Sequence, residues 1–293
     1  MRIGLIIASR GRPKLLARLL LSLGRQKRPP DEVVLCVVGD EDLSTNFASE
    51  DAHLNITVLY SSPGSCAQRN KGLAFLYGRA DVVLFIDDDF WMSATYILEL
   101  ERLFLTNEDV VAATGLVLAD GATTAGITIA EAEKRLEDYA WDPKTNEVIR
   151  DVPDTYGCNM AFRMSEISEL KFDERLPLYG WQEDVDFSAQ LQGHGRIVWT
   201  NALWGVHLGI KESKVSGVRF GYSQVINPLF IFRKGNMSLR RAVSLILKNV
   251  AANAAKSVYP ECYIDRWGRL KGNAIGLFHA LSGKLDPTYI LDL

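Results

Sequence analysis

Three consecutive carboxylates, Asp87, Asp88 and Asp89, follow an apolar run and precede two aromatic residues in the segment LFIDDDFW. Like charges about 5 Å apart repel by roughly 3 kcal/mol at an effective dielectric constant of about 20, unless water or a cation neutralises them. Mg²⁺ and Mn²⁺ prefer hard oxygen ligands, and Mg²⁺ is commonly held by carboxylates together with substrate phosphates. The segment therefore indicates a divalent-metal site for a phosphorylated substrate, with a solvated acidic turn as the alternative.

A phosphatase pattern is a second chemical interpretation of these letters. In that pattern an aspartate nucleophile ends a strand, and an acid/base aspartate lies two residues later, followed by Thr or Val. Trp91 occupies that last position here. The pattern also usually begins its domain, whereas three earlier strands are expected in this chain, so the phosphatase interpretation is disfavoured.

Two further groups with chemical potential come later in the chain. Glu183 and Asp184 begin an expected helix in GWQEDVDFSAQLQGHG, where the helix dipole favours the ionised carboxylate that a general base needs. Acidic residues at a helix N-terminus are also ordinary capping residues, so both interpretations stay open for this pair. His207 follows the expected strand RIVWT and can complete an oxygen-rich metal site or donate to a phosphate.

The elements that must position these groups alternate between strands and helices. Expected strands are RIGLIIA, EVVLCVV, ITVLY, DVVLFI and VVAATG, and expected helices are one that begins at Pro13, one over AQRNKGLAFLYG, one at about 93–104, and EAEKRLEDYA. This alternation implies a mostly parallel sheet covered on both faces, so the fold class is α/β. Ligands of such sheets bind at the carboxyl ends of the strands, where DVVLFI delivers its acidic residues.

The composition excludes several classes of protein. A chain of 293 residues that is 47% apolar and 24% charged can bury a core, and its formal net charge of -3 argues against a general nucleic-acid-binding role. Cys36, Cys66, Cys158 and Cys262 show no CxxC spacing, so neither a zinc site nor a disulfide framework is indicated. Because no secretory signal or membrane-spanning apolar stretch is present, we expect a cytoplasmic location.

The order of the motifs resembles family 2 glycosyltransferases of the GT-A fold, which transfer sugars from nucleotide diphosphosugars with inversion. The resemblance depends on the strand-ending DDD, then GCNMAFR, then FDE followed seven residues later by QEDVDF, and then His207. The segment IIASRGRPKLLARLLLSLGRQ also resembles the family's first strand and helix, and GSCAQRNKGLAF resembles its G…xRNxG segment. The resemblance covers roughly residues 1–235 and implies a GT-A sheet with Rossmann-like topology.

The resemblance also assigns roles to individual residues. It implies a divalent metal, Mn²⁺ or Mg²⁺, with Asp89 as its main ligand, Asp87 near the ribose or the metal, and His207 reaching the metal or the diphosphate. It makes Asp184 the base that deprotonates the acceptor hydroxyl, with Glu183 as the alternative. The nucleotide-sugar-binding residues that it implies are Ala8, Ser9, Arg10, Asp40, Arg69, Asn70, Asp87, Asp88, Asn159 and Arg163.

This sequence departs from the family pattern at three places. Ala8 and Ser9 stand where the family usually has Pro-Thr, and VVGDED stands in place of a DDxS-type turn, which leaves Asp40 as the candidate for recognition of the nucleotide base. Gln182 precedes the acidic pair where Gly is commoner. For Arg69, a surface ion pair is the alternative to a bidentate contact with phosphate.

We expect a catalytic domain over residues 1–230, with a nucleotide-sugar half at about 1–118 and an acceptor half at about 119–230. A C-terminal helical extension should follow at 231–293. Its helix from about Ser238 to Val258 is basic and amphipathic, so it could lie on an anionic membrane surface, pack on the protein or form a homodimer.

The expected function is transfer of a sugar from a UDP- or dTDP-linked donor to a hydroxyl of a glycan or lipid-linked glycan, in cell-surface polysaccharide synthesis. The enzyme would work in the cytoplasm, at the inner membrane face if the C-terminal helices bind lipid, and with no nucleic-acid partner. Two alternatives remain. One is a sugar nucleotidyltransferase of similar fold, because the segment ASRGRPK faintly resembles the phosphate loop of such enzymes, and the other is a degenerate sugar-binding scaffold.

Overall fold

The computed structural model describes residues 1–44, 54–145, 147–211 and 216–293. The chain forms two compact units. The first comprises Met1–Pro63, Ala67–Lys171 and Leu191–Ser213, and the second comprises Gly64–Cys66, Phe172–Gln190 and Lys214–Leu293. The domain boundary expected at residue 230 lies inside a helix of the second unit, α8 (Gly217–Arg233).

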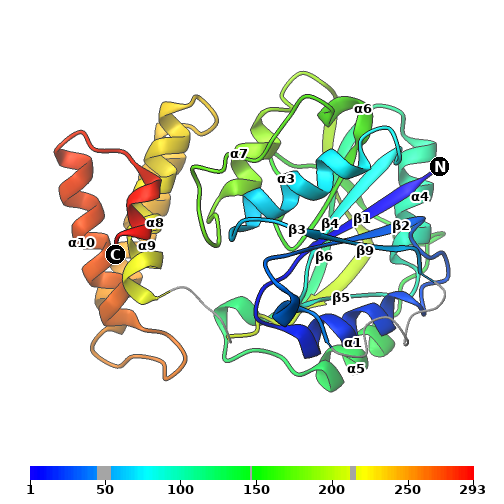
Figure 1. Ribbon diagram of the computed structural model, residues 1–293, viewed down its shortest axis with the longest axis horizontal. Coiled ribbons are helices and arrows are strands. Elements are labelled where there is room, and N and C mark those ends of the chain that lie inside the picture. The colour runs from blue at the N-terminus through cyan, green and yellow to red at the C-terminus, as the bar shows by residue number, and fades with distance from the viewer. Residues whose placement is uncertain (45–53, 146, 212–215) are drawn as a thin grey trace. The chain divides into compact units, whose positions relative to one another are not determined.

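The first unit is built on one mixed sheet (Figure 1), whose strand order is β3-β2-β1-β4-β8-β6-β9-β5, with β7 paired to β9. The strands are β1 (Ile3–Ala8), β2 (Glu32–Val37), β3 (Ile56–Tyr60), β4 (Val82–Asp87), β5 (Phe90–Met92), β6 (Val110–Asp120), β7 (Ile149–Asp151), β8 (Asn159–Arg163) and β9 (Arg196–His207). Strands β3, β2, β1 and β4 run parallel, β8 is antiparallel to both of its neighbours, and β6 is parallel to β9. The expected α/β fold is confirmed.

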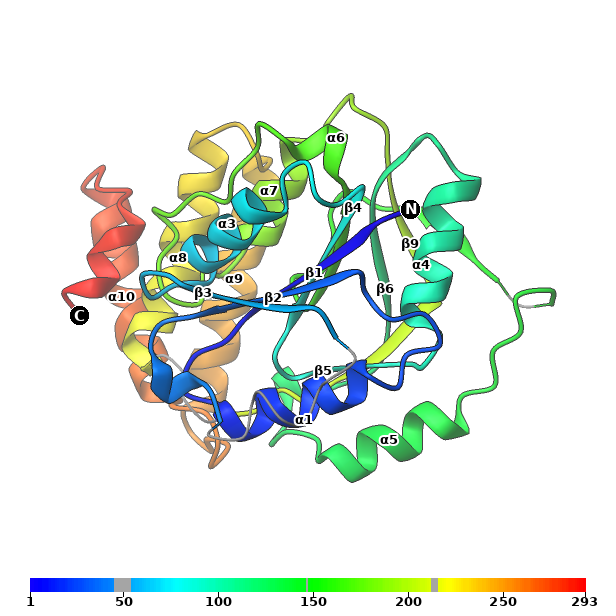
Figure 2. The same cartoon turned by 45° about the vertical axis from the view of Figure 1, so that its right-hand side comes forward.

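Helices cover both faces of the parallel strands, which explains why those strands are apolar at consecutive positions. The described helical segments of this unit are α1 (Pro13–Leu23), η1 (Asp40–Asp42), most of α3 (Ser65–Leu76), α4 (Tyr96–Thr106), η2 (Gly121–Thr123), α5 (Ile129–Asp138) and α6 (Met164–Ile167). Leu5 and Ile7 share a core with the leucines of α1, whereas Ile6 points to the other face, where it lies under Gly72 of α3. Figures 1 and 2 both place α1 and α5 on the opposite side of the strands from α3.

The second unit is helical. It contains α7 (Glu183–Ala189), α8, α9 (Leu239–Lys256), α10 (Arg266–Leu281) and η3 (Pro287–Leu291). The sequence did not predict α8, because Pro228 lies inside it and proline is usually excluded from a helix interior. A Cβ on Gly272 of α10 would lie 2.0 Å from the carbonyl oxygen of Val218, so glycine is what lets α10 approach α8 so closely.

A buried amide network holds these helices together. Gln224 of α8 donates through Nε2 to Asn249 Oδ1 at 2.7 Å and accepts at Oε1 from Asn253 Nδ2 at 2.8 Å. Asn253 Nδ2 also donates to Asn273 Oδ1 at 2.8 Å, which connects α9 to α10. Because each buried amide has partners, the network fixes how these helices pair without the desolvation cost of an unsatisfied polar group.

Candidate functional site

The three adjacent carboxylates lie where β4 ends and the chain turns into β5. Asp87 is the last residue of β4, and β5 folds back so that Phe90 pairs with His207 at the end of β9. The end of β6 lies on the other side of β9, where Asp120 pairs with His207. The sheet therefore brings the ends of β4, β6 and β9 to one edge, and His207 is the last residue of a strand that runs further than the RIVWT segment predicted.

Asp87, Asp89 and His207 form a group that could hold a metal ion. One ligand atom from each of them lies within 4.8 Å of the other two. The side chains of Asp89 and His207 are 5% and 6% exposed, whereas that of Asp87 is 25% exposed, so the group is open to solvent on the Asp87 side. Two carboxylates and one imidazole are a donor set that suits Mn²⁺ or Mg²⁺, and the residues therefore fit the expected cofactor.

The buried charges at this edge shift one another's pKa values. Burial raises the pKa of Asp88 to about 6, although Arg12 opposes the shift. Burial would also raise the pKa of Asp89, but the hydrogen bond and charge of His207 lower it. His207 would lose its proton more easily on burial, yet the carboxylates of Asp120 and Asp89 raise its pKa to about 10. The His207 side chain thus lies beside the same carboxylates whose negative charge a divalent cation would neutralise.

Asp120 positions the imidazole, although no pattern in the sequence indicated this residue. Its Oδ1 lies 2.9 Å from His207 Nδ1, which leaves His207 Nε2 facing Asp89 Oδ1 at 3.3 Å. Asp120 itself accepts hydrogen bonds from the Ala122 amide at 2.8 Å and from the Tyr156 hydroxyl at 2.7 Å. Carboxylates that bind the second nitrogen of a metal-ligating histidine fix its tautomer and orientation in this way.

The loop between β1 and α1 is tied to the acidic turn. Ser9 donates its hydroxyl proton to Asp88 Oδ2 at 2.6 Å, and Arg12 Nη1 donates to Asp88 Oδ1 at 2.7 Å. Arg12 Nη1 also lies 3.5 Å from Asp89 Oδ2. Asp88, 4% exposed, therefore anchors the β1–α1 loop. Ser9 was predicted at this site, whereas Arg12 was not, and Arg10 beside them is exposed.

The chain after β9 closes over Asp89 through a glycine turn. Gly209 has a φ of +64°, and a Cβ there would lie 2.0 Å from the backbone of Gly121. This turn directs the amide of Ile210 toward Asp89 Oδ2, to which it donates at 2.9 Å. The backbone carbonyl of Asp89 also accepts from the Leu208 amide at 2.8 Å, so Asp89 is held at both its side chain and its backbone.

Arg69 on α3 joins the same edge. It is 4% exposed and donates through Nη2 to Asp87 Oδ1 at 3.0 Å and to the carbonyl of Gly157 at 3.1 Å. The ion pair that was the alternative for this residue thus exists, but it is buried and lies inside the candidate site. Asn70, the next residue of α3, is half-buried. Ala8 ends β1 and pairs with Asp87.

Three predicted nucleotide-sugar residues have side chains that bind elsewhere, although the backbone of Asn159 pairs with Ile86, next to the acidic turn. Asn159 is fully buried, and its Oδ1 accepts from Thr114 and the Gly115 amide, so its side chain joins β8 to β6. Arg163 pairs with Val82 at the opposite end of β4, where its guanidinium donates to carbonyls at the end of α4 and beyond. Asp40 is exposed at η1 and accepts from Tyr60.

The Asp40 prediction overlooked the residue that organises this loop. Asp42 is 1% exposed and accepts from the amides of Gly11, Val38 and Gly39. It therefore connects the end of β2 to the β1–α1 loop. Its signal in the sequence is weak, because the two aspartates of GDED cannot be distinguished by spacing alone.

Glu183 and Asp184 begin α7 in the second unit, as the sequence predicted for a helix with an acidic start. Asp184 is half-buried and Glu183 is 7% exposed. The residue before them, Gln182, has φ 75° and ψ 18°, which is a left-handed conformation that L residues other than glycine adopt at a cost. Its Oε1 is buried and accepts no hydrogen bond from any residue in the described part of the chain.

Replacing Gln182 by glycine should therefore stabilise the protein. Gln182→Gly relieves the left-handed strain and removes a buried unpaired carbonyl, and we expect a gain of about 1 kcal/mol in the free energy of unfolding. Ala189→Gly, at the other end of α7, is the matched control and should cost about 1 kcal/mol. Urea unfolding of the three proteins measures both changes; a destabilised Gln182→Gly variant would contradict the prediction.

A lysine from the end of α8 holds α7 in place. Lys234 Nζ donates to Asp173 Oδ2 at 2.7 Å and to Asp186 Oδ2 at 2.6 Å, and the side chain of Asp186 is only 1% exposed. Arg175 donates to Asp173 as well, at 2.8 Å. Burial would raise the pKa of Asp173, but the hydrogen bonds from Arg175 and Lys234 lower it.

Lys234→Met should destabilise the second unit by about 3 kcal/mol, because Asp186 would stay buried without its counter-charge. The neighbouring Arg233 is exposed and forms no ion pair with any described residue, so Arg233→Met is the matched control and should change stability by less than about 0.5 kcal/mol. Since the folded-state pKa of Asp173 is lowered, its stabilisation exists above a pH of about 4 and is lost as the pH falls. The difference in the free energy of unfolding between wild type and Lys234→Met, measured in urea, should thus become smaller below that pH. Equal differences at pH 7 and pH 3 would contradict this prediction.

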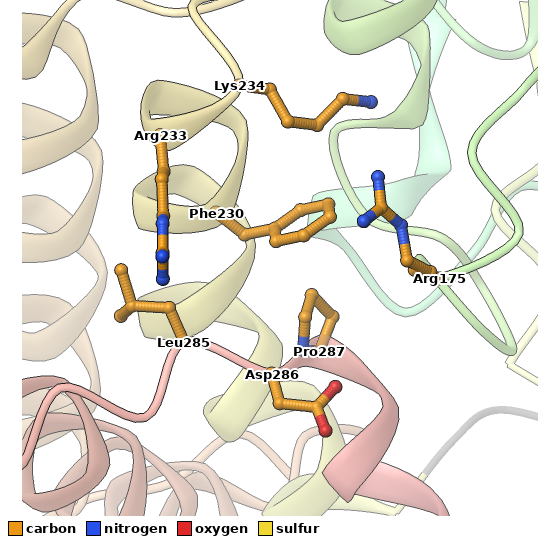
Figure 3. Close-up of a pocket in the computed structure, with 7 residues that line it drawn as sticks. All are labelled: Arg175, Phe230, Arg233, Lys234, Leu285, Asp286 and Pro287. Atoms are coloured by element: carbon orange, nitrogen blue, oxygen red, sulfur yellow. The ribbon is translucent and has the colours of Figure 1, made fainter.

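A cavity of 450 Å³ lies beside this lysine in the second unit (Figure 3). Arg175, Arg233 and Lys234 form its cationic lining, and Phe230 lies between Arg233 and the other two. Because Arg175 and Lys234 already pair with Asp173, their charge is largely compensated. The ion pairs of Arg175 and Lys234 thus account for two of the three cationic side chains, and Arg233 is exposed.

Comparison with known proteins identifies the family to which this chain belongs. Residues 5–170, more than half of the chain, match the family model described as Glycosyl transferase family 2. A search of curated proteins found no match. The solved structure of S. aureus TarS 1–349 in complex with UDP-GlcNAc is similar, with a TM-score of 0.52 and 16% identity over 98% of this chain and 89% of that one.

A second solved structure shares the fold. The mannosyltransferase PcManGT from Pyrobaculum calidifontis, in complex with GDP-Man and Mn²⁺, has a TM-score of 0.52 and 17% identity over 99% of this chain and 85% of that one. A longer S. aureus TarS structure has a TM-score of 0.51 and 16% identity over 88% of this chain, which spans 44% of its length. At these identities the likeness establishes a GT-A fold. Among the described helices, none has the length and apolar character needed to cross a bilayer.

Proposed function

Since the chain belongs to glycosyl transferase family 2, we propose that it transfers a sugar, with inversion, from a nucleotide-diphosphosugar to a hydroxyl of a glycan or lipid-linked glycan. The observation that carries the proposal is the group of Asp87, Asp89 and His207 at the carboxyl edge of the sheet. We propose UDP or dTDP as the donor nucleotide and a cell-surface polysaccharide or glycolipid as the product. The UDP-GlcNAc in the TarS complex and the GDP-Man in the PcManGT complex define which donors to test first.

The residues that would hold the metal are Asp87, Asp89 and His207. When bound, Mn²⁺ or Mg²⁺ would neutralise the charge of the donor diphosphate and of the departing nucleotide. The chain supplies a fixed site for it, because Asp120 orients His207, and the Ile210 amide orients Asp89. Ser9, Asp88, Arg69 and Asn70 are our candidates for the donor side of this edge.

Asp184 is our candidate for the base that removes the proton of the acceptor hydroxyl. It lies in the first turn of α7, where the helix dipole favours the ionised carboxylate. The Val185 amide donates to Asp184 Oδ1 at 2.9 Å and orients that carboxylate. Glu183, which is 7% exposed, is the alternative and has less access to an acceptor.

Calorimetric titration of UDP, dTDP, GDP and CDP, each with Mn²⁺ and with EDTA, tests the proposal on the full chain. We expect one nucleotide to bind tightly in Mn²⁺ and at least about tenfold more weakly in EDTA, because the ion joins the diphosphate to the carboxylates. Transfer from the sugar donor of that nucleotide, with an inverted anomeric product seen by NMR, would complete the test. Equal affinities with and without metal for all four nucleotides would overturn the proposed role of the acidic group.

Asp120→Asn should weaken Mn²⁺ binding by about 10- to 100-fold, although Asp120 is not one of the three proposed metal ligands. The amide cannot supply the negative charge that supports His207, and it can present an N–H to the imidazole instead of an acceptor. Asp138→Asn, an exposed aspartate at the end of α5, is the control and should bind Mn²⁺ like the wild type. Electron paramagnetic resonance of free Mn²⁺ measures both; wild-type affinity of Asp120→Asn would show that His207 needs no such partner.

A further inference from the structure

The charge of the chain is divided unevenly along its length. Residues 231–293 carry ten Lys or Arg and four Asp or Glu, a formal charge of +6, whereas residues 1–230 carry 23 basic and 32 acidic side chains, a formal charge of -9. The basic part is the part that forms α9, α10 and η3. A partner of this part should therefore be anionic.

The outward face of α10 is apolar. Trp267, Phe278 and Leu281 recur at i, i+11 and i+14, which places them on one side of the helix, and they are 64%, 68% and 90% exposed. Gly272 and Gly276 lie on the opposite side, where α10 packs against α8. The packing of the unit thus uses the glycine side of α10 and leaves its large apolar side chains in solvent.

Helix α9 continues this pattern with a second exposed stripe. Leu239, Val243 and Leu247, at i, i+4 and i+8, are 51%, 41% and 63% exposed, whereas Ala242 and Ile246 between them are buried. Exposed lysines accompany both stripes, Lys248 on α9 and Lys271 on α10. Scattered exposed apolar residues are ordinary, but rows of them on two neighbouring helices indicate an interaction surface.

We propose that the exposed apolar faces of α9 and α10, with their flanking lysines, dock on the surface of an anionic lipid bilayer. The stripe from Trp267 to Leu281 is about 21 Å long at the rise of an α-helix, so α10 would lie flat in the interface with its aromatic side chains among the lipid headgroups. The lysines then meet the anionic headgroups, and the net charge of +6 favours the approach. None of these side chains is among the proposed catalytic residues, and the proposed partner is the membrane itself.

Flotation of the full chain with lipid vesicles tests the proposal. We expect recovery with vesicles of phosphatidylcholine and phosphatidylglycerol, at least about tenfold weaker partitioning into phosphatidylcholine alone, and a further loss in 0.5 M salt. The triple variant Trp267→Gln, Phe278→Gln, Leu281→Gln should partition at least about tenfold more weakly. The control pair Tyr77→Gln, Leu105→Gln changes side chains that are 60% and 59% exposed in the first unit and should behave like the wild type.

A charge variant gives an independent arm, since it leaves the apolar faces intact. Lys248→Gln with Lys271→Gln should lose much of the preference for phosphatidylglycerol vesicles while retaining the weak binding to phosphatidylcholine. Equal flotation of wild type and triple variant would overturn the proposal. A second result would also overturn it: the wild type is a dimer by sedimentation velocity, the triple variant is a monomer, and vesicles do not recruit the wild type. A second copy of the chain would then cover these faces.

Discussion

Asp89→Asn should abolish metal-dependent nucleotide binding, so the affinity measured in Mn²⁺ should fall at least about tenfold, to its level in EDTA. Asp89 is one of the three proposed ligands, and its carboxylate also receives the Ile210 amide and lies beside the His207 imidazole. Asparagine keeps the shape and can still accept from Ile210, so the variant removes the charge with little change in the turn. The affinity in EDTA should stay at the wild-type level.

Calorimetry of wild type, Asp89→Asn and Asp89→Ala separates charge from structure. If Asp89→Ala also lowers the melting temperature, as expected from the lost Ile210 contact, Asp89→Asn still reports on the charge alone. Asp138→Asn serves as the control for a general change in net charge. Wild-type affinity of Asp89→Asn in Mn²⁺ would mean that the ion is held elsewhere or that binding needs no ion.

Local patterns predicted the acidic edge because each strand and its end are encoded within a few residues. The apolar run before Asp87 and the leucine repeat after Pro13 define β4 and α1 without any information from the rest of the chain, and both were predicted at nearly their observed bounds. The rule that ligands bind at the carboxyl ends of parallel strands then placed Asp87 to Asp89 at a site.

Residues joined to this edge by pairing between distant strands could not be predicted in the same way. Asp120 reaches His207, 87 positions later in the chain, because β6 pairs with β9. Bulges shift the register of this pairing, and a one-residue slip would turn the side chain to the other face. Arg12 was not selected from the segment IIASRGRPK, since its pairing with Asp88 depends on the conformation of the β1–α1 loop. Conversely, Arg163 was chosen by its motif although five residues of β8 carry it to the far end of the sheet.

The helical part was predicted incompletely for a different physical reason. α8 buries Gln224 and Asn227 and contains Pro228, so its sequence lacks the apolar repeat by which a buried helix is normally found. Its stability depends on partners: the amide network with α9 and α10, and the close approach to the glycines of α10. These contacts depend on residues from three helices at once, so no single segment of the sequence predicts them.

Asp184→Asn should lower the rate of sugar transfer by about 10²- to 10⁴-fold while the donor still binds. The substitution removes the proton acceptor from the start of α7 but keeps an oxygen that can accept from the Val185 amide, so the helix should remain intact. Because Asp184 is assigned to the acceptor and not to the metal, the Mn²⁺-dependent affinity for the nucleotide should not change. This combination distinguishes a base from a residue that holds the donor.

Glu183→Gln is the matched comparison, since the two carboxylates are adjacent and differ in burial. If Asp184 is the base, Glu183→Gln should retain most of the transfer rate, and any loss should come with a lower melting temperature because Glu183 is 7% exposed. Single-turnover kinetics give the transfer rate of each variant, and calorimetry gives its affinity for the donor. Unchanged transfer by Asp184→Asn with a large loss in Glu183→Gln would move the base to Glu183, and unchanged transfer by both would place proton removal outside α7.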